Sequence, residues 1–287
     1  MTNNIQIKFW GVRGSTPCAN AENIVFGGNT TCLQIQSELI PELLIVDCGT
    51  GFRNLGNHLM ESNSECKGRI FITHPHWDHL QGFPFFKPFY NEASWFRVYL
   101  PPQDGVGCKE ILQGHMSNTF FPVTMDMLDA DMECETYVPG KINFEGYSVD
   151  YKWAKHTVPT AMFKFEIGGK VIVFAPDNEL PIDKSTESLT YLNEFKEFVK
   201  GVDVLIHDAQ YNRKQYLERQ GWGHSNWNTV IEVTKGLGIG KLLLTHHDPD
   251  STDKYLAELD EKVNKEFGGE YEQIGFIKEG QDITLSL

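Results

Sequence analysis

The residues best suited to do chemistry lie in residues 74–79, which read His-Pro-His-Trp-Asp-His and directly follow the apolar run 69–73. This segment holds three histidines and one aspartate, in a chain with 10 histidines among 287 residues. Chance rarely produces such crowding. Neutral imidazoles and carboxylates are the ligands that zinc and similar divalent metals take in proteins. The spacing therefore predicts a metal site.

The same spacing bears on the number of metals. In a zincin motif, two histidines one helical turn apart bind a single zinc. His74 and His76 are instead two positions apart, at a strand end or in a loop. His79 is then free to turn toward a different ion. The pattern therefore favours two metals.

Further polar residues stand where apolar, strand-like runs end. They are Asp47, His156, Asp177, Asp208 and His246. Functional groups at strand ends are positioned by a rigid sheet and face a cleft. Together with the 74–79 segment, these five residues predict one shared site.

Two positions leave alternatives open. His247 competes with His246 for a place in the site, but a residue at the immediate strand end points inward and its neighbour points away. This alternation favours His246. Asp47 is expected to fix the 74–79 loop by hydrogen bonds rather than to bind a metal.

Secondary structure follows from periodicity and composition. Short runs rich in β-branched and aromatic residues predict strands at 5–10, 31–36, 43–47, 69–73, 96–100, 147–153, 163–167, 171–175, 202–206 and 241–245. Helical patterns cover 104–115, 187–200, 225–236 and 252–267, the third with Ser225 as its N-cap and Gly236 as its stop. Strands in two groups, each followed by helices, predict a single layered α/β domain over residues 1–287.

Composition narrows the partners. With 25 basic and 39 acidic residues, the formal net charge is −14, which repels phosphate backbones at long range. Long nucleic acids are therefore poor candidates. No run approaches the ~18 apolar residues that span a membrane, and no signal peptide is expected. Six cysteines without CxxC pairing favour reduced thiols and a cytoplasmic location.

The order of the polar residues resembles the metallo-β-lactamase fold superfamily. The chain has the HxHxDH segment, then a distant histidine, an aspartate after an apolar strand, and Leu-Leu-Leu-Thr-His. The resemblance covers most of the chain and implies a four-layer αββα sandwich with two metals at one edge of the paired sheets. One ion would be held by His74, His76 and His156, and the second by Asp78, His79 and His246, with Asp177 bridging them.

The stretch Gly223-His224-Ser225 resembles the phosphodiesterase branch of this superfamily, which includes ribonuclease Z and a cyclic-phosphate diesterase. The resemblance implies that His224 works beside Asp208 as a proton donor, while Asp78 also orients the nucleophile. The branch often has Glu in place of Asp208, so this pairing departs from the pattern. The Gly-rich N-terminal segments "FWGVRGSTP" and "FGGNTTC" also resemble this branch, and they either offer amides to an anion or only pack the sandwich edge.

A further departure concerns the substrate. Ribonuclease Z carries a long basic arm that, in bacterial forms, lies between the third-motif histidine and the bridging aspartate. The interval between His156 and Asp177 has room only for a hairpin turning at Gly168-Gly169. A small phosphodiester is therefore expected, above all a cyclic nucleotide or related cyclic phosphate. The aromatic-rich residues between 80 and 125 form core, a lid or a substrate wall.

The expected cofactors are two divalent ions, most of all Zn²⁺, with Mn²⁺ or Fe²⁺ as alternatives, and no organic cofactor. Two such ions supply hydroxide from a shared water and neutralise charge on the phosphoryl group. A homodimer is compatible with the sequence. Two other functions stay open: a lactam or thioester hydrolase with the same ligands, and a non-catalytic binding protein on the same fold. His76 argues against a diiron redox enzyme, which carries a carboxylate there.

Overall fold

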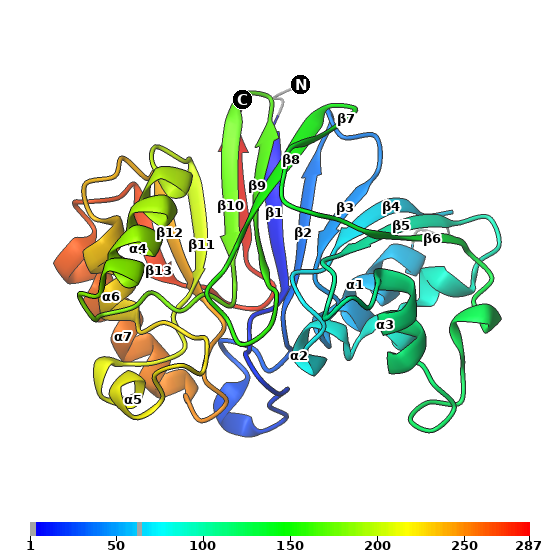
Figure 1. The fold of residues 1–287 in the computed structure, drawn as a ribbon, viewed down its shortest axis with the longest axis horizontal. Helices are drawn as coiled ribbons and strands as arrows, with labels where there is room; N and C mark the ends of the chain where they lie inside the picture. Colours follow the sequence, from blue (N-terminus) through cyan, green and yellow to red (C-terminus); the bar gives the residue numbers. More distant parts are fainter. Residues whose placement is uncertain (1–3, 62–64) are drawn as a thin grey trace.

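The computed structural model describes residues 4–61 and 65–287. Within these ranges the strands form two mixed, seven-stranded sheets that face each other (Figure 1). The first has the order β14-β1-β2-β3-β4-β5-β6, and the second has the order β13-β12-β11-β10-β9-β8-β7. Helices α1 and α3 lie outside the first sheet, and α4, α6 and α7 lie outside the second (Figure 1). The expected four-layer αββα sandwich is confirmed.

The strands are β1 Asn4–Gly11, β2 Cys32–Ser37, β3 Leu43–Val46, β4 Lys67–Phe71, β5 Trp95–Leu100, β6 Asp131–Thr136, β7 Ile142–Phe144, β8 Tyr147–Trp153, β9 Ala161–Ile167, β10 Lys170–Ala175, β11 Val204–Asp208, β12 Lys241–Thr245, β13 Gln273–Phe276 and β14 Asp282–Ser286. The α-helices are α1 Gly51–Glu61, α2 Trp77–Leu80, α3 Cys108–His115, α4 Thr186–Val199, α5 Arg213–Glu218, α6 Trp227–Thr234 and α7 Asp253–Phe267. Short 3-10 turns lie at Ala21–Asn23, Phe83–Phe85, Lys87–Tyr90 and Met125–Met127.

Three apolar clusters hold the layers together, as strand β10 illustrates. Successive side chains of a strand point to opposite faces. Ile172 and Phe174 pack into the cluster between the sheets, whereas Val173 and Ala175 pack against the outer helices α4, α6 and α7. A third cluster joins the first sheet to α1 and α3. Because β10, β11 and β12 are parallel and buried on both faces, they read as nearly continuous apolar runs.

Strand direction brings the polar residues to one edge. β3 runs parallel to β4, and β10, β11 and β12 run parallel to one another. The carboxyl ends of parallel strands meet at the same edge of a sheet. Residues 156–177 form the expected short connection, in which β9 and β10 pair as an antiparallel hairpin. Gly168 and Gly169 turn this hairpin with φ values of 54° and 84°.

Two local predictions are wrong. The helix expected from residue 104 begins at Cys108, because Asp104 and Gly105 have positive φ values in a preceding turn. The N-cap of α6 is Asn226, whose side chain accepts a hydrogen bond from the Thr229 amide. Ser225 is drawn away from that role because its amide donates to Asp208 and its hydroxyl donates to the Asn178 carbonyl.

The aromatic-rich region divides into two parts. Phe83, Phe86 and Phe89 are fully buried in the cluster beneath α1. Phe85 and Phe120 remain 50% and 79% exposed. The region therefore contributes some of its aromatic side chains to the hydrophobic core and leaves others on the protein surface. In the part of the chain that the structure describes, no helix is both long and apolar enough to cross a membrane.

Candidate metal centre

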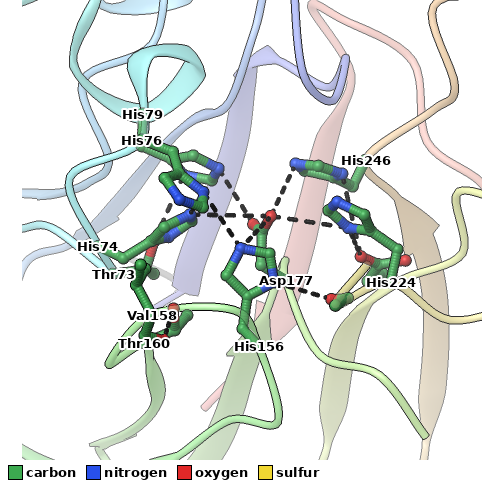
Figure 2. Close-up of polar contacts among 12 residues, drawn as sticks. Thr73, His74, His76, His79, His156, Val158, Thr160, Asp177, His224 and His246 are labelled. Carbon is green, nitrogen blue, oxygen red and sulfur yellow. Dashed lines mark hydrogen bonds and ion pairs between the residues drawn. The ribbon is translucent and has the colours of Figure 1, made fainter. Parts of the chain in front are cut away.

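The predicted metal ligands converge between the two sheets. The segment after β4 supplies four of them from one side: His74 and His76 from its loop, and Asp78 and His79 from the short helix α2. The β8–β9 loop supplies the third histidine, and the ends of β10 and β12 supply an aspartate and the last histidine: His156, Asp177 and His246. Figure 2 shows the histidines from both sides directed toward Asp177. The structure thus brings together all seven residues that the sequence pointed to.

Three histidines form the first group. Nδ1 of His76 lies 2.8 Å from Nε2 of His74 and 3.2 Å from Nε2 of His156. The three ring nitrogens lie within 4.8 Å of one another, close enough to ligate one ion. This geometry matches a three-histidine face of a metal site.

Two aspartates and two histidines form the second group. Nε2 of His246 lies 3.2 Å from Oδ2 of Asp78 and 3.2 Å from Oδ1 of Asp177. Nε2 of His79 lies 3.3 Å from Oδ2 of Asp78 and 3.0 Å from Oδ2 of Asp177. These atoms also lie within 4.8 Å of one another.

Asp177 stands between the two groups. Its Oδ1 atom lies 4.0 Å from Nε2 of His74 and 3.9 Å from Nε2 of His156, on the side of the three histidines. Its other contacts are to His79 and His246 of the second group and to His224. A carboxylate in this position can bridge two ions.

The donor atoms of these residues are better suited to bind divalent cations than to form hydrogen bonds with one another. His79 Nε2 and Asp177 Oδ2 are buried and make no hydrogen bond within the described residues, although they lie 3.0 Å apart. Two imidazole nitrogens at 2.8 Å, as in His74 and His76, satisfy each other only when one of them carries a proton and the other does not. Buried polar atoms normally have partners, and cations placed between these groups would supply them.

The outer nitrogens of these histidines are held by acceptors. Nδ1 of His79 lies 2.8 Å from Oδ2 of Asp47, and Nδ1 of His156 lies 2.9 Å from the carbonyl oxygen of Gly223. Nδ1 of His246 lies 3.3 Å from Oε1 of Gln210. Such contacts fix the tautomer and aim the other nitrogen at a metal.

Asp47 and His247 are the two positions whose role the sequence left open. Asp47 accepts hydrogen bonds from the Thr73 amide at 2.8 Å and from the Thr73 hydroxyl at 3.0 Å, in addition to its contact with His79. It thus holds the 74–79 loop and belongs to neither ligand group. His247 turns away, with Nε2 2.7 Å from the carbonyl oxygen of Ile277, while His246 faces the centre.

Burial sets the protonation of the three-histidine group. It lowers the pKa of His74 well below its ordinary value and lowers the pKa of His76 to about 4. It also lowers the pKa of His156. These imidazoles are therefore neutral near pH 7, which is the form that binds a metal.

Carboxylates dominate the second group. Burial opposes charge on His79 and His246, but Asp177 and Asp78 outweigh it. They raise the pKa of His79 well above its ordinary value and the pKa of His246 to about 9. The two carboxylates thus draw positive charge into the site, a role that a divalent cation would take.

His224 and Asp208 lie beside the second group. Nδ1 of His224 is 2.7 Å from Oδ2 of Asp208 and 3.7 Å from Oδ1 of Asp177. The other oxygen of Asp208 accepts hydrogen bonds from the amides of Gln210 and Ser225. Asp177, Asp208, His224 and His246 are also compact enough to hold an ion. The hydrogen bonds made by both Asp208 oxygens favour the pairing with His224 instead.

Close backbone packing confines the histidine rings. A Cβ atom on Gly14 would lie 2.2 Å from Nδ1 of His246, and one on Gly223 would lie 2.1 Å from Nδ1 of His156. Only glycine allows these approaches. The Ser15 amide donates to Oδ2 of Asp78 at 2.8 Å, so this N-terminal loop offers an amide to a predicted metal ligand.

Strained backbone marks the same place. Ser15, Asp47 and His246 have φ values of 63°, 63° and 60°, and Asp104 is the other non-glycine residue with positive φ in the described ranges. Such conformations persist where the surroundings enforce them, and they cluster at functional sites.

Sequence reasoning missed Glu179. Its buried carboxylate accepts hydrogen bonds from the amides of Gly221 and Gly223 and from the Tyr216 hydroxyl. It therefore holds the loop that presents the Gly223 carbonyl and His224. The available signal was a glutamate placed directly before the buried Leu180, two positions after Asp177.

Comparison with known proteins decides the family. Residues 43–247 match the family described as "Beta-lactamase superfamily domain". The chain belongs to this superfamily. The matched segment extends from β3 to His247 and contains both ligand groups.

Relatives within the superfamily span nearly the whole chain. Ribonuclease Z of Streptococcus suis is 22% identical over 98% of this chain and 100% of its own length. The solved metallo-β-lactamase fold protein YhfI of Bacillus subtilis aligns with a TM-score of 0.71 at 18% identity, covering 99% of this chain and 100% of the other. The short form of human tRNase Z aligns with a TM-score of 0.64 at 17% identity, covering 98% and 100%. The resemblance to the superfamily and its phosphodiesterase branch is confirmed.

Proposed function

We propose that this protein is a dinuclear-metal hydrolase that cleaves a small phosphodiester, above all a cyclic nucleotide or related cyclic phosphate. The main support is the His224–Asp208 pair beside Asp177. Nδ1 of His224 lies 2.7 Å from Oδ2 of Asp208 and 3.7 Å from Oδ1 of Asp177. A lactam or thioester hydrolase needs the metal ligands but no such pair. The naming of full-length relatives as ribonuclease Z also supports phosphodiester chemistry.

A cavity lies over the candidate metal centre. Its volume is about 400 Å³, and its lining includes Ser15, His76, Asp78, Asp177 and His224. This volume falls in the range of small-ligand sites, roughly 300–1,000 Å³. A single phosphodiester can therefore reach both ligand groups and His224 together.

The expected chemistry divides between the ions and the chain. Divalent ions bound by the two groups would supply a nucleophilic water and offset charge on the phosphoryl oxygens; zinc is the first candidate because the donors are histidine and aspartate. Asp78 is held by the Ser15 amide and orients the nucleophile. As an imidazolium, His224 donates the Nε2 proton to the leaving oxygen, while Asp208 accepts from Nδ1 and stabilises the positive charge on the ring.

Two features support a small substrate. The β9–β10 hairpin leaves no arm between His156 and Asp177 that could grip a folded RNA. The net charge of −14 also disfavours a long phosphate backbone.

The test is a substrate panel with zinc-loaded protein, read by product analysis. It should include 3′,5′-cyclic and 2′,3′-cyclic nucleotides, simple cyclic phosphates and dinucleotides. Turnover of at least one small diester is expected. Processing of precursor transfer RNA with no turnover of any small diester would contradict the proposal.

RNA cleavage is the second candidate, and the relatives favour it. Ribonuclease Z of Streptococcus suis matches over 98% of this chain, so the expected exclusion of long nucleic acids rests on charge and the missing arm alone. The same substrate panel distinguishes RNA cleavage from hydrolysis of a small phosphodiester when precursor transfer RNA is included in it.

A further inference from the structure

A second cavity adjoins the one over the candidate metal centre. It has a volume of about 440 Å³, and Trp77, Phe85, Phe120 and Phe121 contribute aromatic side chains to its walls. Phe85 and Phe121 meet edge to face, with ring centroids 5.2 Å apart. The cavity is thus an aromatic-lined pocket of the size that takes a small ligand.

The aromatic side chains of this pocket are unusually accessible. Trp77 is 74% exposed, Phe85 50% and Phe120 79%, whereas Phe83 and Phe86 in the same stretch are fully buried. The buried rings account for the core beneath α1. The accessible rings make little contribution to that core and are open to contact with a ligand.

The two cavities share a wall. Pro75 and Trp77 line both of them. Pro75 lies between His74 and His76 in the chain, and Trp77 lies between His76 and Asp78. A ligand on the metal centre is therefore directly beside the aromatic pocket.

The two cavities differ in charge. The metal-centre cavity has Asp78, Asp177 and two histidines, His76 and His224, in its walls. Among the described residues lining the aromatic pocket, none is a lysine, arginine, aspartate or glutamate. His115 is the titratable group there, and burial lowers its pKa, which keeps it neutral. Gln81 also lines this pocket and carries an uncharged amide group. An uncharged planar group fits this pocket, and a second phosphate does not.

We propose that the aromatic pocket binds the nucleobase of a nucleotide diester whose phosphate lies at the metal centre. This inference rests on the proposed phosphodiester hydrolysis and narrows its substrate to nucleotides. Each base has a flat π face that stacks on aromatic side chains. The lining identifies Phe85 and Phe120 as residues that set substrate preference.

The test compares two diesters with the same leaving group: the p-nitrophenyl ester of thymidine 5′-monophosphate and methyl p-nitrophenyl phosphate. The kcat/KM ratio should favour the thymidine ester. In the Phe85→Ala/Phe120→Ala variant this ratio should fall by about 5- to 100-fold, as expected when a base loses its stacking partners. Leu189→Ala, an exposed apolar residue on α4, should leave the ratio unchanged.

Binding measurements separate this inference from the proposed function. Calorimetry with zinc-loaded protein should give tighter binding of thymidine 5′-monophosphate than of ribose 5-phosphate, and the variant should lose the difference. If neither diester is cleaved but this difference is present, hydrolysis fails and the pocket assignment stands. If diesters are cleaved and the ratio does not move in the variant, the pocket assignment is overturned. A dimer that dissociates in the variant, with no change in nucleotide affinity, would overturn it in favour of a second copy covering the surface.

Discussion

Nδ1 of His224 lies 2.7 Å from Oδ2 of Asp208, and the second oxygen of Asp208 is held by two backbone amides. Asp208 is fully buried at the end of β11, so its carboxylate cannot swing away. The imidazole is thereby fixed with its Nδ1 occupied and its Nε2 left for the cavity that His224 lines. This pairing sets His224 apart from the predicted metal ligands and underlies its proposed role as a proton donor.

Replacing His224 should therefore affect proton transfer and leave the metals in place. His224→Ala is expected to lower kcat by roughly 10²–10⁴ on an alkyl diester, the usual contribution of a positioned proton donor. The loss should shrink for a nitrophenolate leaving group, which needs no proton. Asp208→Asn should give a smaller loss, and the double variant should be much less than additive. Loss of an ion from His224→Ala would make this residue a ligand.

Asp177 should be required for the ions themselves. Asp177→Ala is expected to lose at least one divalent ion per chain and most activity, because its carboxylate stands between the two ligand groups. Elemental analysis of the purified variant measures this directly. Full occupancy of both ions in that variant would refute the bridging assignment.

The glycine beside His246 gives a test of packing alone. In Gly14→Ala, the new Cβ would lie 2.2 Å from Nδ1 of the buried His246 ring, so the ring must move. The variant should bind the ion of the second group at least about 10-fold more weakly, in line with other disturbances of ligand orientation. Gly269→Ala is the matched control, since its Cβ would meet nothing within 4 Å. Equal metal affinity in the two variants would contradict the assignment of His246.

Glu179 should act through the loop that it holds. Glu179→Gln places an amide donor where the carboxylate accepts from the Gly221 and Gly223 amides. Because Gly223 orients His156 and precedes His224, metal affinity should fall by about 10- to 100-fold and kcat should fall with it. The measurements are competition with a metal-sensitive dye and steady-state kinetics. Glu218→Gln, which changes an exposed residue on α5, is the control. Unchanged metal affinity in Glu179→Gln would show that Glu179 does not support the metal centre through this loop.

The site was largely predictable because its residues follow apolar strands. Asp177, Asp208 and His246 each end or follow a parallel strand, and parallel register delivers their side chains to one edge. Glu179 and Gln210 were not predictable in the same way. Their partners lie on loops that return to the site from distant parts of the sequence, and no local pattern encodes that return.

The fold shows a similar division. The predicted strands of the second sheet were found because β10, β11 and β12 are buried on both faces. Helix α1 was missed, since Gly51, Asn54, Gly56 and Asn57 have poor helix propensity. Its Phe52 and Leu55 pack into the cluster that joins α1 to the first sheet, so tertiary burial outweighs propensity there.

The central claim is that two ions, held by the two ligand groups, support cleavage of a phosphodiester. The most direct measurement is a titration of metal-free protein with zinc while hydrolysis of bis(p-nitrophenyl) phosphate is followed, with bound zinc determined in parallel. Activity should rise to a plateau at two equivalents of zinc per chain. A plateau at one equivalent, or no hydrolysis by protein that holds two, would contradict it.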